Sequence, residues 1–263
     1  MNKDNIYPNI NQSIYLFAFL ISAFLIYFLV VFGLPKLLML EPPSVYFEIA
    51  TRLAMFIPFP FIIYGQNRAN INVWKMIQLK NVSCNDYVLL ALIAICIAII
   101  IHPLANPFNF LKSIRSGYIP IPSIHKPIFN AKFVIDFIGL VLITPVLEEA
   151  FLRGLILNQF LKRYNVWLSL FITSMYFALA HINLTHFEYY FVWGILLGFI
   201  YYKTNSLFFC IILHLILNLL SLMNHSIPIK ITNSTIIIST IIYIVALTLL
   251  FLSITKLSKF KNE

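Results

Sequence analysis

The stretch LITPVLEEAFLRGLIL, residues 142–157, places two adjacent glutamates and an arginine inside an apolar segment. This segment extends from Phe133 to Leu161, which exceeds the roughly 20 residues needed to cross a bilayer. Burying one such charge at the centre of a lipid-spanning helix costs about 2.5–3.5 kcal/mol even on the insertion scale with the smallest values. Three charges in one predicted span therefore require partners, and they are candidates for a functional role.

The composition of the whole chain indicates an integral membrane protein. Of its 263 residues, 61% are hydrophobic and 10% are charged, whereas soluble domains carry about 25% charged residues. A net charge of +9 would suggest a nucleic-acid partner in a soluble protein, but here the basic residues lie mostly in short connections between apolar runs. There they anchor and orient helices, so we predict membrane lipids and no nucleic acid as partners.

Eight apolar runs approach the spanning length and predict an all-α, polytopic membrane protein with about eight transmembrane helices. The runs cover residues 13–34, 45–65, 87–104, 133–157, 166–182, 187–203, 206–222 and 233–255. The first run is longer than the core of a signal peptide, so we predict a retained anchor. The connection 105–132 contains four prolines and four basic residues, which favours an irregular or surface-lying segment over a ninth span.

The distribution of basic residues predicts the orientation. Cytoplasmic termini place ten basic residues inside and six outside, as the positive-inside rule requires, although the basic connection 105–132 then lies outside. The ten are Lys3, Arg68, Lys75, Lys80, Lys162, Arg163, Lys203, Lys256, Lys259 and Lys261, and the six are Lys36, Lys112, Arg115, Lys126, Lys132 and Lys230. We therefore expect a multi-pass protein of the cell membrane with both termini in the cytoplasm.

The charged stretch in the fourth predicted helix has a simple internal geometry. Glu149 and Arg153 are four residues apart, so they share a face of the helix and can form an ion pair. Glu148 points about a quarter turn away, so one carboxylate can be held by the arginine while the other faces a different neighbour. An ion-pair lock between helices, without a catalytic role, stays open as an alternative.

The fifth and seventh predicted helices carry histidines. His181 ends the fifth helix, with Phe177 one turn earlier on the same face, and the seventh helix carries His214 and Asn218 four residues apart. A histidine near a membrane interface is often only a hydrogen-bonded structural residue. Asn218 alone can join helices through a hydrogen bond worth about 0.6–2 kcal/mol.

Together, the three helices offer two carboxylates, two imidazoles, an amide and a guanidinium. Such a set can activate water, with a carboxylate as general base, histidines as metal ligands or proton carriers, and an amide or imidazole as donor to an oxyanion. At 1.5 Å per residue, the predicted depths of Glu148 and His214 agree, whereas His181 lies roughly 10 Å too far outward. Tilt or a later start of the fifth helix would remove this difference.

Two further groups of residues are predicted to have no chemical role. Cys96 and Cys210 lie in apolar runs and read as small buried hydrophobic residues, since no CxxC or Cys/His spacing indicates a disulfide framework or zinc finger. Structural or interfacial roles are predicted for the remaining polar residues within or beside the apolar runs: Glu48, Arg52, Asp136, His102, His186 and Glu188. Within this second group, a functional role is the strongest alternative for Glu188.

Three short motifs occur in order along the chain: Glu-Glu-x-x-x-Arg at 148–153, Phe-x-x-x-His at 177–181 and His-x-x-x-Asn at 214–218. Each motif is weak alone, but the ordered set resembles the CPBP family of CAAX prenyl proteases and bacteriocin-processing enzymes of the Abi type. The motif-bearing part, 133–222, is about a third of the chain. The resemblance implies an intramembrane endopeptidase with an all-helical fold.

The resemblance also implies roles for the motif residues. Glu148 would activate water together with His181, while Glu149 and Arg153 would hold the site together or orient its members. The third motif, His214 and Asn218, would supply metal or oxyanion contacts.

Family accounts differ on whether a zinc ion is bound, so a metalloprotease and a glutamate protease both stay open. If a metal is used, its ligands would be Glu148, His181 and His214. The chain lacks the HExxH motif, which leaves the question undecided.

The resemblance suggests a membrane-associated peptide or protein as substrate, including a bacteriocin or pheromone precursor. An abundance of Ile, Asn, Lys and Phe fits an AT-rich bacterial genome. The chain would then comprise N-terminal helices and an amphipathic connection (1–132), a catalytic core (133–222) and a C-terminal helix with a basic tail (223–263). One alternative is a non-proteolytic scaffold or bacteriocin self-immunity protein of the same fold. A second is a transporter that uses the buried charges as an ion relay. The lack of paired repeats in the sequence counts against the transporter.

Overall fold

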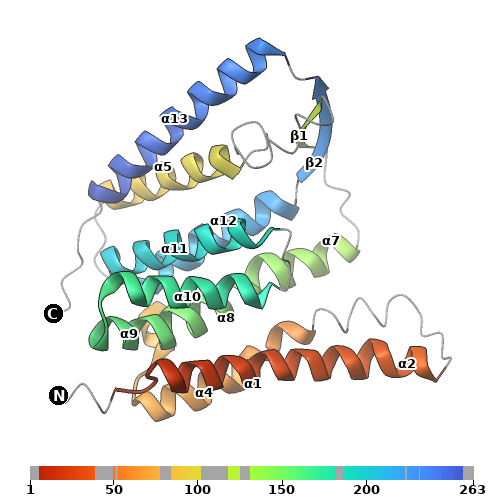
Figure 1. The fold of residues 1–263 in the computed structure, drawn as a ribbon, viewed down its shortest axis with the longest axis vertical. Helices are drawn as coiled ribbons and strands as arrows, with labels where there is room; N and C mark the ends of the chain where they lie inside the picture. Colours follow the sequence, from red (N-terminus) through yellow and green to blue (C-terminus); the bar gives the residue numbers. More distant parts are fainter. Residues whose placement is uncertain are drawn as a thin grey trace. The chain divides into compact units, whose positions relative to one another are not determined.

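The computed structural model describes residues 6–38, 50, 53–77, 84–101, 118–124, 131–181, 186–222, 224–230 and 232–256. These residues form helices, short connections and one two-stranded sheet (Figure 1). The prediction of a helical fold is confirmed in its main feature. The small sheet is an addition that the apolar runs did not indicate.

The chain divides into two compact units, each built from two separate stretches of sequence. The first unit comprises Met1–Leu79 and Ile138–Ile211, and the second comprises Lys80–Phe137 and Ile212–Glu263. These units do not test the predicted division into N-terminal helices (1–132), a catalytic core (133–222) and a C-terminal helix (223–263), which stays a prediction.

The first unit is a bundle of helices. Its described elements are α1 (Ile10–Phe28), η2 (Leu29–Gly33), α2 (Leu34–Leu37), η3 (Ala54–Phe56), α4 (Pro58–Ala69), η4 (Val73–Ile77), most of η5 (Phe137–Ile143), α8 (Thr144–Glu149), η6 (Ala150–Leu157), α9 (Asn158–Arg163), α10 (Val166–Ala180), α11 (Phe187–Thr204) and the first turn of α12 (Leu207–Leu222). At the start of α1, Asn9 and Gln12 form a reciprocal capping box: each side chain accepts a hydrogen bond from the other residue's backbone N–H, both at 2.9 Å.

The charged helix is longer than its apolar run. Helical structure continues without a break from α7 (Ala131–Asp136) through η5, α8 and η6 to the end of α9 at Arg163. We expected the helix to end at residue 157, but it continues for six more residues, of which Asn158, Gln159, Lys162 and Arg163 are polar. Its central segment, η6, has wide π-helical turns, in which the Asn158 N–H donates to the carbonyl of Arg153, five residues earlier. Turns of this kind are frequent at functional sites.

Segment η6 lies at the centre of the first unit. All eight of its residues are buried, and it packs against α4, η4, α9, α10 and α11. Two glycines permit this close packing: a Cβ on Gly154 would approach Val73 to 2.5 Å, and one on Gly65 would overlap Leu155. A helix surrounded on every side is apolar all round, which explains why the sequence of this stretch shows no polar face.

The second unit contains α5 (Cys84–Ile101), β1 (Tyr118–Ile124), α7, most of α12, β2 (Asn224–Lys230) and α13 (Asn233–Lys256), and α13 packs against α5. Strands β1 and β2 pair antiparallel, with Tyr118 opposite Lys230 and Ile124 opposite Asn224. The connection 105–132 was predicted to be irregular or surface-lying; residues 118–124 form a strand and are not irregular, and the surface-lying alternative stays a prediction. Proline is confined to sheet edges because it donates no ladder hydrogen bond, and both strands of a two-stranded sheet are edges.

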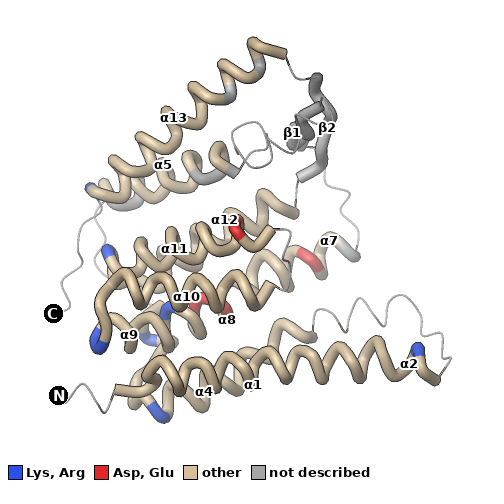
Figure 2. Tube along the Cα trace, viewed as in Figure 1, with Lys and Arg blue, Asp and Glu red and all other residues tan. Residues whose placement is uncertain are grey.

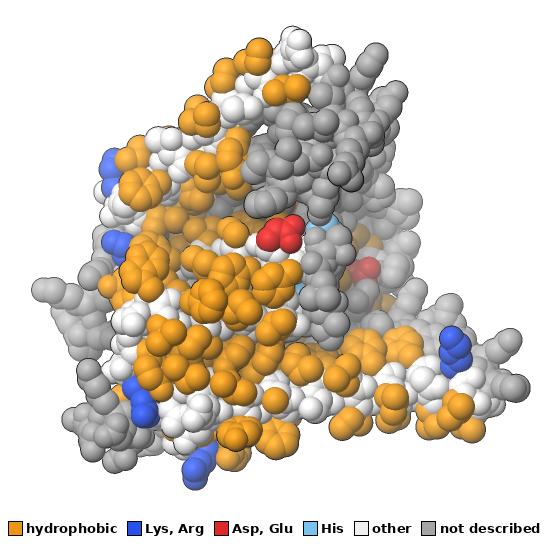
Figure 3. All heavy atoms as spheres, in the orientation of Figure 1, with side chains coloured by type: hydrophobic (Ala, Val, Ile, Leu, Met, Phe, Trp, Pro, Cys, Tyr) orange, Lys and Arg blue, Asp and Glu red, His pale blue; other side chains and the backbone are white. Residues whose placement is uncertain are grey.

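The surface of the described helices fits a lipid environment. Two helices meet the length and hydropathy requirements of a membrane span, Ile10–Leu37 with 28 residues and Ile236–Lys256 with 21, and both leave most side chains unburied. Figure 3 shows hydrophobic side chains covering much of the visible face, and Figure 2 shows most Lys and Arg residues at or near helix ends. The chain is a membrane protein on this evidence, while the count of eight spans stays a prediction.

Candidate functional site

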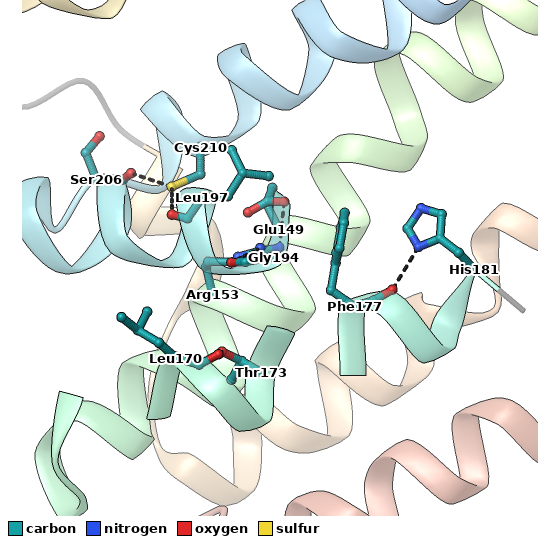
Figure 4. Close-up of polar contacts among 10 residues, drawn as sticks. All are labelled: Glu149, Arg153, Leu170, Thr173, Phe177, His181, Gly194, Leu197, Ser206 and Cys210. Carbon is teal, nitrogen blue, oxygen red and sulfur yellow. Dashed lines mark hydrogen bonds and ion pairs between the residues drawn. The ribbon is translucent and has the colours of Figure 1, made fainter. Parts of the chain in front are cut away.

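Glu149 and Arg153 form the buried ion pair that their spacing predicts. Arg153 Nη1 donates to Glu149 Oε1 at 2.8 Å, and the two side chains are 1% and 0% exposed. Arg153 Nη2 also donates to the carbonyl of Gly194 on α11 at 3.0 Å (Figure 4). The guanidinium therefore joins the charged helix to α11, and this charge-assisted bonding offsets part of the cost of burying both groups.

Glu148 has a different environment from its neighbour. Its side chain is half-buried, whereas Glu149 is fully buried. The Glu148 carboxylate interacts electrostatically with the phenol of Tyr190 on α11. The predicted division of labour is thus seen in the geometry: Arg153 holds Glu149, while Glu148 lies towards another helix.

His181 caps the C-terminal end of α10 and is held by three contacts. Its Nδ1 lies 2.8 Å from the carbonyl oxygen of Phe177. Its ring is 4.7 Å from that of Phe177 and stacks on Tyr190, with centroids 3.8 Å apart and planes 20° apart. A carbonyl only accepts hydrogen bonds, so neutral His181 carries its proton on Nδ1 and presents a lone pair at Nε2.

Phe177 connects the ion pair to His181. The guanidinium carbon of Arg153 lies 4.9 Å from the centroid of the Phe177 ring, a cation–π contact. Figure 4 shows Phe177 between the Arg153–Glu149 pair and His181. The chain reverses direction between α9 and α10, so α10 runs antiparallel to the charged helix. Phe177 lies beside Arg153, and His181, one turn later on α10, therefore lies on the side of Glu149, one turn earlier on the charged helix.

The difference in depth predicted between His181 and Glu148 disappears because the charged helix is longer than expected. The charged helix ends at Arg163 rather than at residue 157, and the next helix begins at Val166. Glu148 and His181 are each 15 residues from these adjacent ends. At 1.5 Å per residue, the six added residues account for about 9 Å, which is close to the whole discrepancy predicted for His181. By the same count, the predicted agreement between Glu148 and His214 no longer holds, because His214 lies only seven residues after the first residue of α12.

Three contributors to the site were not identified from the sequence. Tyr190 stacks on His181, and the Gly194 carbonyl accepts from Arg153. Cys210, at the start of α12, is fully buried within electrostatic range of Glu149 and Arg153, and its Sγ donates to the Leu197 carbonyl at 3.4 Å. A tyrosine or glycine in an apolar helix gives no sequence signal, and the prediction that Cys96 and Cys210 are buried is confirmed.

The remaining motif residues, His214 and Asn218, belong to the second unit. Both lie on α12, one and two turns beyond Cys210, and His214 is buried. Their convergence with Glu148 and His181 stays a prediction. Among the residues predicted to be structural, His186 is exposed and Glu188 and Asp136 are half-buried, whereas Glu48, Arg52 and His102 lie outside the described residues.

The predicted zinc ligands are Glu148, His181 and His214. Among the residues that the structure describes, no group of three or more His, Cys, Asp or Glu side chains is arranged to hold a metal ion. Glu148 and His181 belong to the first unit and His214 to the second, so a metal site formed by these three residues stays a prediction.

Residues 130–220 match the family model described as type II CAAX prenyl endopeptidase Rce1-like. The matched segment, about a third of the chain, contains all three motifs and therefore every residue of the candidate site. This segment is therefore similar to the CAAX-type proteases that the three motifs resemble. No curated protein and no solved structure matches the chain.

Proposed function

We propose that the protein is an intramembrane endopeptidase that hydrolyses a peptide bond of a membrane-associated peptide or protein. The observation that carries this proposal is the arrangement around His181, whose Nδ1 proton is held by the Phe177 carbonyl so that Nε2 keeps its lone pair, and whose ring stacks on Tyr190. The family match over residues 130–220 supports the same class of reaction.

In the proposed reaction, Glu148 accepts a proton from a water molecule whose oxygen attacks the scissile carbonyl carbon. The carbonyl π electrons move to oxygen and form a tetrahedral oxyanion, which a positioned donor stabilises. When the C–N bond breaks, the proton is delivered to the leaving nitrogen through Glu148 or His181. His214 and Asn218 are the proposed oxyanion donors, on the strength of the resemblance.

Glu149 is not the proposed base because its carboxylate already forms an ion pair with Arg153. Its carboxylate is completely buried and bound to Arg153, so taking a further proton would disrupt the pair. Glu148 is half-buried and lies one residue earlier on the same helix. We therefore assign the structural role to Glu149 and the catalytic role to Glu148.

We further propose that the protein crosses a bacterial cell membrane several times, with both termini in the cytoplasm. Within the first unit, Arg163 donates to the Ile6 carbonyl at 3.3 Å, and the Arg68 guanidinium lies 5.7 Å from the Tyr7 ring. The N-terminal segment thus lies at an end of the bundle that carries two basic residues, as the positive-inside rule favours. Reporter fusions at each terminus would test the orientation.

The function is tested by cleavage of fluorogenic membrane-associated peptides with purified protein in liposomes, comparing wild type with Glu148→Gln. Loss of a general base lowers the rate by about 10²–10⁴-fold, and we expect a loss in this range. Glu188→Gln is the matched control, because Glu188 is also a half-buried glutamate near a helix end; its rate should stay within about twofold.

Two results would contradict the proposal. One is the absence of cleavage by wild-type protein across a panel of membrane peptides that includes prenylated and unmodified sequences. The other is an unchanged rate in Glu148→Gln. If the cellular activity also survives Glu148→Ala at normal protein levels, the non-proteolytic scaffold or immunity function replaces the protease.

A further inference from the structure

Tyr190 is the closest aromatic neighbour that the described structure gives to His181. The two rings are nearly parallel at a centroid distance of 3.8 Å, whereas Phe177 lies at 4.7 Å with a tilt of 57°. The same phenol interacts electrostatically with Glu148. Tyr190 therefore stacks on one member of the proposed water-activating pair and lies within electrostatic range of the other, from a helix that carries none of the three motifs.

We propose that Tyr190 is a positioning residue that fixes the plane of the His181 imidazole for reaction. This inference rests on the proposed function. It assigns the role to the tyrosine ring, which makes the measured stacking contact, rather than to its hydroxyl.

The other described restraints on the His181 ring come from its own helix, so a contact from a second helix restrains the ring in a way that they do not. The hydrogen bond from Nδ1 reaches Phe177, four residues earlier, and Phe177 also supplies the tilted ring contact. One hydrogen bond fixes the tautomer but still permits rotation about the bond axis. A parallel ring on the opposing helix removes this rotation, because swinging the imidazole would give up the stacked surface.

The position of Tyr190 is in turn set by close packing between α10 and α11. A Cβ at Gly194 would lie 2.7 Å from the Cα of Ser174, so the two backbones approach as closely as glycine allows. Tyr190 precedes Gly194 by one turn on the same helix face. The neighbouring Tyr189 also packs edge-on against Tyr190, with centroids 5.3 Å apart. These contacts hold the phenol ring over His181.

The test compares Tyr190→Phe, which keeps the ring, with Tyr190→Leu and Tyr190→Met, which remove it and provide two chances of a folded protein. Phe191→Leu is the matched control, because Phe191 is an adjacent aromatic residue whose ring contacts are to Phe171 and Phe187. Misplacing a catalytic group by about 1 Å can cost about 10²-fold. We expect kcat to fall about 10–100-fold in the Leu and Met variants with KM unchanged, and to stay near wild type in Tyr190→Phe and Phe191→Leu.

A second readout does not depend on activity. Diethyl pyrocarbonate modifies accessible imidazole nitrogens, and the rate at His181 can be followed by peptide mass spectrometry. Removal of the stacked ring should raise this rate several-fold in Tyr190→Leu and Tyr190→Met, whereas Tyr190→Phe should react as wild type does.

The two readouts separate the possible failures. Unchanged modification of His181 in the Leu and Met variants would overturn this inference, whatever the cleavage result. An unchanged kcat in those variants, with wild type active and Glu148→Gln inactive, would also overturn it while leaving the proposed function standing. Absence of cleavage by wild type would instead overturn the proposed function.

Discussion

The guanidinium of Arg153 is bound at once by the Glu149 carboxylate on its own helix and, through its other terminal nitrogen, by the Gly194 carbonyl on α11. Both charged side chains are buried, so neither can gain hydration in exchange for the contact. A buried pair of this kind contributes less by its own attraction than it would cost to break. Its place beside the proposed base suggests that it holds the helix bearing Glu148 against α11.

Arg153→Met should destabilise the protein strongly. The substitution leaves Glu149 as an uncompensated buried charge, for which the expected cost is about 3–5 kcal/mol. The double variant Glu149→Gln/Arg153→Met removes both charges and should recover a large part of this loss. Equilibrium unfolding of the purified protein in mixed detergent measures both values. Equal stability of Arg153→Met and wild type would show that the ion pair is not structurally important.

Gly194→Ala should destabilise the contact between α10 and α11. The added Cβ would lie 2.7 Å from the backbone Cα of Ser174, which cannot move without shifting the helix, and overpacking of this kind costs about 1–3 kcal/mol. Gly198→Ala is the matched control, since its Cβ meets the flexible end of the Leu170 side chain at 2.8 Å. Its cost should be below about 1 kcal/mol. Similar unfolding free energies for the two variants would argue against a backbone clash at Gly194.

His214→Ala and Asn218→Ala should each reduce cleavage about 10²–10³-fold if their side chains stabilise the oxyanion. The decrease should appear in kcat rather than KM, because the interaction forms in the transition state. His186→Ala serves as the control, since this exposed histidine at the start of α11 has no proposed role. Near-normal kcat in both α12 variants would separate these residues from the catalytic site.

Removal of divalent metal should leave cleavage within about twofold of its starting rate if Glu148 and His181 activate water without a metal, as in the proposed reaction. The measurement is peptide hydrolysis before and after dialysis against a strong chelator. A large loss that zinc restores would contradict this expectation. In that case the set Glu148, His181 and His214 becomes the first to test by mutation.

Several features of the site follow from local sequence geometry. Residues four apart on a helix are neighbours whatever surrounds them, so the spacing of Glu149 and Arg153 was sufficient to predict their ion pair. The same rule separates Glu148 from Glu149 by a quarter turn. Composition alone was sufficient to predict a helical membrane protein and two buried cysteines, since these depend on apolar content rather than on the arrangement of helices.

Other features depend on contacts between distant parts of the chain. The helix bearing Glu148 extends to Arg163 although it ends in two basic residues, and this extension places Glu148 and His181 at the same distance, 15 residues, from the adjacent ends of their helices. Likewise, the alternating prolines of β1 read as irregular until a second strand, about a hundred residues later, is available for pairing. Hydropathy reports only where a segment is apolar, so it cannot set the end of a helix or supply a partner strand.

The sequence by itself was sufficient to predict a helical membrane protein, the Glu149–Arg153 pair and the positions of the three motifs, because each of these depends on composition or on spacing within one helix. Only the tertiary structure decided that Tyr190 stacks on His181 and that Gly194 receives Arg153. Both contacts come from α11, whose sequence carries no motif. They exist because a glycine lets two helices approach closely, and that approach is a property of the packed pair rather than of either helix alone.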